Sequence, residues 1–361
     1  MAIAQVFSYS SLNSLTRAMM SSLLASDEWQ LLYNTPDFQG AAAILRESVY
    51  GPYLMSFEMS DLTPRRAVYE IRKRLTEAYV RFIGISPKPL KIVLSELLKL
   101  YELDNLKASL RGIVIGESWD RVRHTLFPLG DFGKLPCEAM METGNLMDAT
   151  ELLKSTVYYD PLSRGLPRYM QEKNLFVLEV ALDLDYWRRL WKSCQKLAPS
   201  DWFQVRSLIG SVIDMNNLLW ALRYRIYYHL SEEEIINYTL PFGYRVQDQQ
   251  IRMIASGGDI EFILGDLYPD YPMLNEIRND PQQNLPLLEN WLMKRSIDVC
   301  RTIFAGYPFH AGVPIAYLHL LAMEIEDLTV LMEAKSMELP FNRFKNFLLF
   351  NQSSREKTYQ N

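Results

Sequence analysis

The sequence has 361 residues, of which 48% are hydrophobic and 22% are charged, and 38 basic against 43 acidic residues give a formal net charge of −5. These proportions are typical of globular proteins and exclude a disordered tail, a coiled-coil rod or a small disulfide scaffold. A mildly acidic chain without a long basic tract is also poorly suited to phosphate backbones, so we expect no nucleic-acid partner.

The cysteines and the N-terminal segment indicate the compartment. Cys137, Cys194 and Cys300 lie far apart and form no CxxC pair, which predicts no disulfide framework and a reducing environment. We expect no transmembrane helix, because no stretch approaches 18 uninterrupted apolar residues. We also expect no signal peptide, because the first residues lack a basic start and Arg17 interrupts their apolar part.

Helical periodicity dominates the chain. Thr63-Pro64 has the form of an N-cap followed by proline at the first helical position, and Gly84 is predicted to end the helix that starts there. Apolar residues then recur at helical spacing from Leu90 to Ile113, and again from Val205 to Ile226. Because convincing alternating strands are absent, the sequence predicts an all-α fold.

One segment of ten residues recurs three times. The copies ELDNLKASLR, DMNNLLWALR and EIEDLTVLME start at residues 102, 214 and 324, so they are 112 and 110 residues apart. Their shared polar positions are an acid at the first place and an amide or acid at the fourth: Glu102 and Asn105, Asp214 and Asn217, Glu324 and Asp327. Such self-similarity at a fixed period predicts a repeat architecture.

A second element recurs upstream of the first. Three segments each lead through a short helix to a turn rich in tyrosine and proline: Thr35-Pro36-Asp37-Phe38, Thr143-Gly144-Asn145-Leu146 and Gly257-Gly258-Asp259-Ile260. We therefore predict three helical repeats of about 110 residues, at 1–126, 127–236 and 237–340, followed by a polar C-terminal tail at 341–361. Three like units favour a closed pseudo-threefold arrangement, although the sequence also permits an open arc.

Catalytic signatures are missing from the sequence. It contains no GxxxxGK[ST], GxGxxG, GxSxG or HExxH motif, and we interpret Gly257-Gly258-Asp259 as the start of a helix rather than a phosphate cradle. The histidines at 124, 229, 310 and 319 are scattered, and no base neighbours a cysteine. We predict no catalytic, cofactor-binding or metal-ligating residues.

The repeated acids need a separate interpretation, since paired carboxylates can carry acid–base chemistry. Catalysis requires one asymmetric cluster, whereas these acids occupy three equivalent places. We interpret them as polar flanks of packed helices or as partners in ion pairs, for which the nearby candidates are Arg111, Arg223, Arg225 and Lys335.

Several of these segments resemble a known family. A C-terminal signature is formed by the segment 308–318 (PFHAGVPIAYL), by Glu324 to Leu328 and by Lys335. It resembles the signature of the C subunits of archaeal and bacterial V/A-type ATP synthases. These subunits are relatives of the d subunit of the eukaryotic vacuolar ATPase (V-ATPase). Residues 213–225 and 102–111 resemble the family's two other such helices, so the resemblance covers roughly residues 5–340.

Two positions depart from the repeated pattern. The third copy has Glu333 where the other copies have Arg111 and Arg223. The first copy has Ile113 where the others have Arg225 and Lys335. We therefore expect that any ion-pair scheme is not strictly threefold.

The resemblance implies a non-catalytic central-stalk subunit with an all-α, funnel-shaped, pseudo-threefold fold. Such a subunit links the membrane proteolipid (c/K) ring to the central shaft formed by the D and F subunits, and transmits torque for ATP-coupled transport of protons or sodium ions. It is a peripheral component on the cytoplasmic face, with no cofactor and no small-molecule substrate. We hypothesise that the narrow end meets the ring and that the cavity takes the tip of the shaft.

Two alternatives stay open on the sequence alone. One is a helical metal-dependent enzyme that uses the repeated acids, and stoichiometric metal in the purified chain would support it. The other is a generic helical scaffold, which would have the same architecture but no preference for ATPase components.

Overall fold

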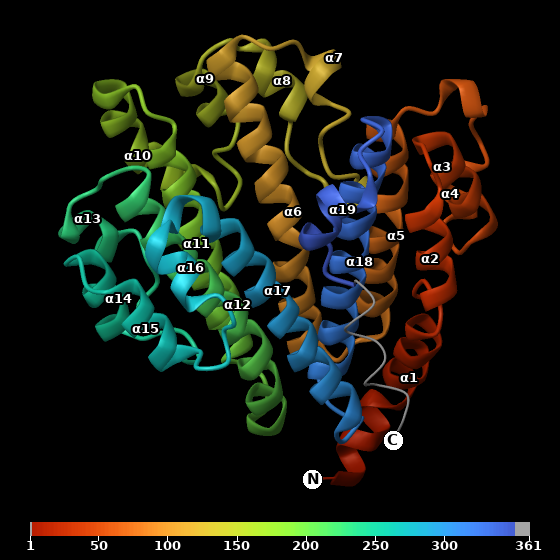
Figure 1. Cartoon of the computed structure of the whole chain (residues 1–361). Helices are drawn as coiled ribbons and strands as arrows, with labels where there is room; N and C mark the ends of the chain where they lie inside the picture. The colour runs from red at the N-terminus through yellow and green to blue at the C-terminus, as the bar shows by residue number, and fades with distance from the viewer. Residues whose placement is uncertain (1, 351–361) are drawn as a thin grey trace.

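The computed structural model describes residues 2–350, with side chains from residue 6 onward, and this part of the chain is helical with no β-strand (Figure 1). The helices of the first third are α1 (Ala2–Met20), α2 (Ser26–Asn34), α3 (Phe38–Glu47), α4 (Gly51–Leu54), η1 (Met59–Asp61), α5 (Pro64–Ile85), α6 (Lys88–Ile115) and α7 (Trp119–Val122). Those of the middle third are η2 (Gly130–Phe132), α8 (Cys137–Glu142), α9 (Leu146–Glu151), α10 (Tyr159–Glu172), α11 (Phe176–Cys194), α12 (Pro199–Ile226) and α13 (Glu232–Asn237). Those of the last third are α14 (Asp248–Ala255), α15 (Ile260–Leu267), α16 (Leu274–Asn279), α17 (Pro281–Ala305), α18 (Gly312–Ser336), α19 (Phe341–Phe344) and η3 (Lys345–Phe347).

The helices α5, α6, α11, α12, α17 and α18 form the centre of the molecule (Figure 1). Each packs against the next in this order, and α18 packs against α5, so that the series closes on itself. The shorter helices lie outside this series: α8 packs against α6, α14 against α12, and α3 against α18. Helix α1 adds a further layer over α18 and α5.

Neighbouring helices in this ring run in opposite directions. The end of α6 meets the start of α11 through Arg111 and Glu179, whose Nε and Oε1 are 2.6 Å apart. The end of α12 meets α17 in the same way through Arg223 and Glu289. At the closing contact, Phe82 near the end of α5 packs edge-on against Tyr317 near the start of α18. The turns α5–α6, α11–α12 and α17–α18 therefore gather at one end of the ring, the lower end in Figure 1.

Local signals set where several helices begin, as the sequence predicted. Thr63 caps α5 by accepting a hydrogen bond from the Arg66 amide, with Pro64 in the first turn. The recurring Asx positions are also N-caps: Asp37 caps α3, Asn145 caps α9 and Asp259 caps α15. The last of these confirms that the Gly257-Gly258-Asp259 segment opens a helix.

The predicted end of α5 was wrong. Gly84 lies inside the helix, which continues to Ile85 and ends at Ser86, whose backbone is extended (φ −76°, ψ 147°). The following residue, Pro87, explains this, because a proline ring disfavours helical backbone at the residue before it. The stop signal was therefore Ser86-Pro87 rather than the glycine.

One large apolar core runs through most of the molecule. Buried aliphatic and aromatic side chains from α1 to the segment after η3 belong to one large cluster, and a small separate cluster of Val122, Leu126 and Cys137 lies at α7 and α8. The apolar stripes predicted from Leu90 to Ile113 and from Val205 to Ile226 lie on α6 and α12. Within residues 2–350, no helix combines the length and the apolar character needed to cross a bilayer.

Candidate functional site

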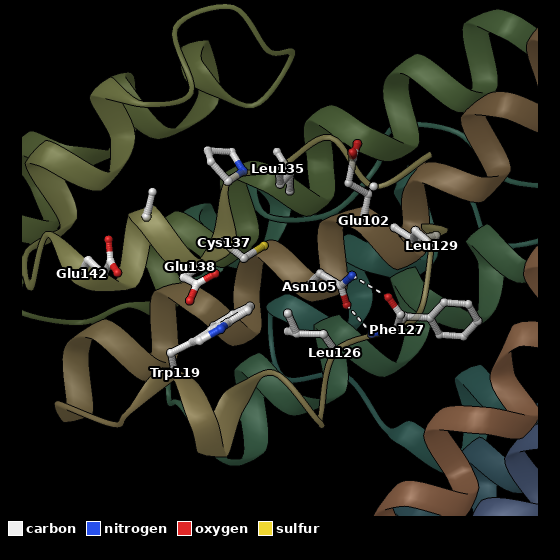
Figure 2. Close-up of a pocket in the computed structure, with 13 residues that line it drawn as sticks. Glu102, Asn105, Trp119, Leu126, Phe127, Leu129, Leu135, Cys137, Glu138 and Glu142 are labelled. Carbon is white, nitrogen blue, oxygen red and sulfur yellow. Dashed lines mark hydrogen bonds between the residues drawn. The ribbon is translucent and has the colours of Figure 1, made fainter. Parts of the chain in front are cut away.

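The repeated polar positions lie on α6, α12 and α18, on faces that meet the segments following or flanking these helices. On α6, Asn105 exchanges two hydrogen bonds with the backbone of Phe127: its Nδ2 donates to the carbonyl at 2.9 Å, and its Oδ1 accepts from the amide at 2.6 Å (Figure 2). Glu102, one turn earlier, accepts from the Lys134 amide and from the Tyr158 hydroxyl, at 3.1 and 2.9 Å. Both side chains hold the segment that follows α7 against the helix.

On α12 the same two positions hold the segment between α13 and α14. Asn217 accepts from the Leu240 amide at 2.8 Å and donates to the carbonyls of Leu240 and Phe242. Asp214 accepts from three successive amides, those of residues 244, 245 and 246, at 2.7, 2.6 and 3.1 Å. Burial raises the pKa of Asp214 to about 6, although these three amide donors act in the opposite direction.

On α18 the fourth position is an aspartate, and its partners differ accordingly. Asp327 accepts from the backbone amides of Leu349 and Phe350. Unlike the asparagines at the other two positions, an ionised aspartate has no N–H donor, so it needs no carbonyl partner. Burial raises the pKa of Asp327 to about 7, although the hydrogen bonds from these two amides lower it.

The first position on α18, Glu324, reaches the beginning of the chain. It accepts from the Leu24 amide and from the Tyr50 hydroxyl, each at 2.8 Å, and lies 3.3 Å from the Arg74 guanidinium. Glu324 and Arg74 are both buried. A buried carboxylate with a cation and two neutral donors is well satisfied, and this arrangement fastens α18 to the first helices.

The expected ion pairs between the repeated acids and the nearby cations were wrong. Arg111 and Arg223 bind glutamates on the next helix, as described above. Arg225 donates to the backbone carbonyls of residues 254, 257 and 258, and Lys335 donates to those of Tyr33 and Thr35. Backbone groups at the ends of α14 and α2 therefore take the place of the acids, since the last carbonyls of a helix have no partner within it.

A cavity of about 610 Å³ opens beside the first of these sites (Figure 2). Trp119 and Leu126 line one side, Glu102 and Asn105 the floor on α6, and Cys137, Glu138 and Glu142 the side formed by α8. The two polar side chains on α6 already have backbone partners, so they hold the cavity wall together. These hydrogen bonds fasten the segment that follows α7 to α6.

The histidines and cysteines lie apart from one another. His310 accepts from the Gly312 amide at the start of α18, whereas His319 contacts Ser296 of α17. Cys137, Cys194 and Cys300 are free and buried, and burial raises the pKa of each thiol, that of Cys194 to about 12. Among the described residues, no three His, Cys, Asp or Glu side chains are grouped so that they could hold a metal ion.

Sequence reasoning missed the buried acid Asp201, which lies in the first turn of α12. Its Oδ2 accepts from the Tyr9 hydroxyl at 2.7 Å, and its Oδ1 accepts from the Ala311 amide at 3.0 Å. It thereby joins α1, α12 and the turn before α18. The only local signal was an acid in the first turn after Pro199, which is common at helix starts and does not indicate distant partners.

Comparison with known proteins supports the family suggested by the repeated segments. The family model described as ATP synthase (C/AC39) subunit matches residues 12–347. The chain is similar to the C subunit of the A-type ATP synthase of Methanocaldococcus jannaschii, with 24% identity over 94% of this chain and 86% of the relative. It is also similar to the corresponding C subunit of Archaeoglobus fulgidus, with 25% identity over 90% and 91% of the two chains. A match that spans nearly all of the described ring places this chain in the family of ATP synthase C/AC39 subunits.

Proposed function

We propose that this chain is a non-catalytic central-stalk subunit of a rotary V/A-type ATP synthase or ATPase. It links the membrane proteolipid ring to a central shaft formed by the D and F subunits and transmits torque between them, as a peripheral component on the cytoplasmic face. The observation that carries the proposal is the closed series of antiparallel helices, which leaves two separate ends for two partners. Membership of the C/AC39 family supports it.

We also propose that the three predicted repeats, 1–126, 127–236 and 237–340, form a closed pseudo-threefold body. The support is that each repeated acid acts on a tyrosine of another repeat, through a hydrogen bond at two of the three places and through its charge at the third. Tyr158 donates to Glu102, and the carboxylate of Asp214 adds to the effect of burial in raising the pKa of Tyr268. Tyr50 of the first repeat donates to Glu324 of the third, so the same contact returns to the start.

Each end of the ring exposes its own group of apolar side chains. The end with the helical turns, here named the hairpin end, exposes Ile85 and Ile92 on α5 and α6, Phe203 on α12 and Tyr307 after α17. Phe203 is 74% exposed. Exposed apolar groups gathered at one end mark a contact surface. We assign the hairpin end to the proteolipid ring.

The opposite end, here named the linker end, is where α6, α12 and α18 finish. Ile115, Tyr227, Tyr228 and Met337 are exposed there, and Ile115 is 72% exposed. Apolar side chains therefore recur after each of the three helices, as a contact with an axial partner would require. We assign the linker end to the shaft.

A torque-bearing connector must resist deformation. Close-packed helices have low compressibility and transmit strain. The ring is also fastened by ion pairs between neighbouring helices, of which Lys107–Asp183 between α6 and α11 is partly buried. These features suit a part that passes force between partners by its shape.

The test is a binding experiment with end-specific variants. The purified chain should co-elute with a D–F shaft complex and with the proteolipid ring in detergent. Phe203→Asp should weaken binding to the ring and leave the shaft complex intact, and Ile115→Asp should have the converse effect. If neither partner binds under conditions in which a relative from the family binds, the proposal is wrong.

A further inference from the structure

The hairpin end concentrates positive charge in a chain whose net charge is −5. The three segments around its turns, 81–92, 192–206 and 301–312, contain one acid, Asp201, and the basic residues Arg81, Lys88, Lys91, Lys192, Lys196, Arg206 and Arg301. We propose that the hairpin end binds the surface of a bilayer that contains anionic phospholipids. This inference rests on the proposed assignment of the hairpin end to the membrane side, and it names a second partner there beside the proteolipid ring.

Four of these cations have no partner in the chain. Lys88 and Lys91 lie in the first turn of α6, and Lys192 and Lys196 lie around the end of α11. All four are exposed, and within residues 2–350 none of their side chains has an ion-pair or hydrogen-bond partner. The acid Asp201 does not offset them, because it is buried and accepts from the Tyr9 hydroxyl and the Ala311 amide. Their charges therefore face solvent and are free to meet phosphate groups.

Exposed apolar side chains stand at the same end as these cations. Ile85 and Ile92 flank the α5–α6 turn, and Phe203 lies in the first turns of α12. Phe7 near the start of α1 is 80% exposed, and it belongs to this end because Tyr9, two residues later, is hydrogen-bonded to the start of α12. Basic groups that meet anionic headgroups, together with aromatic rings that enter the interface, are typical of proteins that bind the surface of a membrane.

The basic patch exists only in the folded chain. Lys88 and Lys192 are 104 residues apart in the sequence, and no turn contributes more than three of the basic residues. Helices α5, α11 and α17 end at the hairpin end and α6, α12 and α18 begin there, which brings the turns together (Figure 1). A charged face that is spread over separate turns suits an extended planar partner, such as the surface of a bilayer.

Charge distinguishes the hairpin end from the linker end, although both expose apolar side chains. The segments that follow α6, α12 and α18 carry exposed acids, among them Asp120, Glu232, Glu233 and Glu338. An anionic surface would repel the linker end, and it would also repel an acidic chain without a basic patch. Binding to anionic lipid therefore requires the hairpin end to face the bilayer.

The experiment measures sedimentation of the full chain with vesicles of phosphatidylcholine alone, or of phosphatidylcholine in which about one lipid in three is replaced by phosphatidylglycerol. We expect binding to the mixed vesicles only. It should weaken as the salt concentration rises, because salt screens contacts between exposed charges. A basic side chain near an anionic surface contributes about fivefold in affinity, so the double variant Lys88→Gln with Lys91→Gln should bind about 25-fold more weakly.

The matched control is the double variant Arg65→Gln with Arg66→Gln, which changes the net charge by the same amount. Both arginines are exposed at the start of α5, at the linker end. Helix α5 has 22 residues, so its two ends lie about 30 Å apart, well beyond the Debye length of about 10 Å. The affinity of this variant should therefore stay within about twofold of the wild type.

Three results would overturn the proposal: equal binding to both kinds of vesicle, binding that salt does not weaken, or equal affinities of the two double variants. The assay with the proteolipid ring in detergent contains no bilayer, so the two proposals fail separately. A chain that binds the ring but not the mixed vesicles overturns only the lipid inference. A chain that binds the vesicles but not the ring contradicts only the assignment to the ring.

Discussion

Replacing Glu324 by alanine should be the most damaging of the single changes at the repeated acids. The substitution removes an acceptor from the Leu24 amide and the Tyr50 hydroxyl, and it leaves the Arg74 guanidinium buried without its carboxylate. Arg74 retains hydrogen bonds to Ser22, which limit the loss. Removal of one partner from a buried ion pair typically costs about 3–5 kcal/mol, and we expect a loss in free energy of unfolding within this range.

The matched comparison is Glu102→Ala. Glu102 has two neutral donors and no buried cation, so unsatisfied donors alone should cost less, about 1–3 kcal/mol. Glu333→Ala, at an exposed position on the same helix as Glu324, should change stability by less than about 0.5 kcal/mol. The assay is urea unfolding followed by far-ultraviolet circular dichroism. Equal midpoints for Glu324→Ala and Glu333→Ala would refute the reasoning.

Three further predictions concern single groups. Asn217→Asp removes the donor to the Leu240 and Phe242 carbonyls and should lower the free energy of unfolding by about 1–3 kcal/mol, measured at pH 8, where the new carboxylate is charged. Gly243→Ala would push a Cβ into the Asp214 carboxylate and the Val246 carbonyl, and thermal unfolding should show a loss of about 1–3 kcal/mol. Burial lowers the pKa of His319 from 6.5 to about 4, so below pH 6.5 the unfolded chain binds a proton that the folded chain does not. Up to about 3 kcal/mol of the free energy of unfolding is therefore present above pH 6.5 and is lost as the pH falls toward 4. Unfolding measured at pH 7 and pH 5 should show a correspondingly smaller loss for His319→Gln than for the wild type.

The helices were predictable because their signals are local. The apolar stripe from Val205 to Ile226 follows from a spacing of three and four residues, and α12 occupies that range. The cap at Thr63 depends on an amide three residues away, so a short window of sequence contains all the information. The prediction at Gly84 was wrong because two local signals competed, and the proline at 87 determined the end of α5.

The partners of the repeated acids were not predictable by the same reasoning. Asp214 binds three backbone amides, and amide groups are present at every residue except proline, so no sequence pattern singles them out. Glu324 binds a residue 300 positions earlier, which only the closure of the ring brings near. A signal did exist in the spacing, since Asn105 binds residue 127 and Asp327 binds residue 349, each 22 positions later.

The repeat pattern nevertheless located the positions that matter. Glu102, Asp214 and Glu324 were singled out by recurrence alone, and the structure gives each of them buried hydrogen-bond donors. The recurrence indicated that the positions were constrained but could not say by what. The boundaries of the three repeats stay a prediction, which the tyrosine contacts support.

The most direct test of the account places a photo-crosslinking amino acid at Phe203 or at Ile115 in the assembled complex. We expect the residue at position 203, on the hairpin end, to crosslink to the proteolipid, and the residue at position 115, on the linker end, to crosslink to one of the D and F shaft proteins. Crosslinks from both positions to the same partner, or to neither, would contradict a connector that joins two partners through opposite ends.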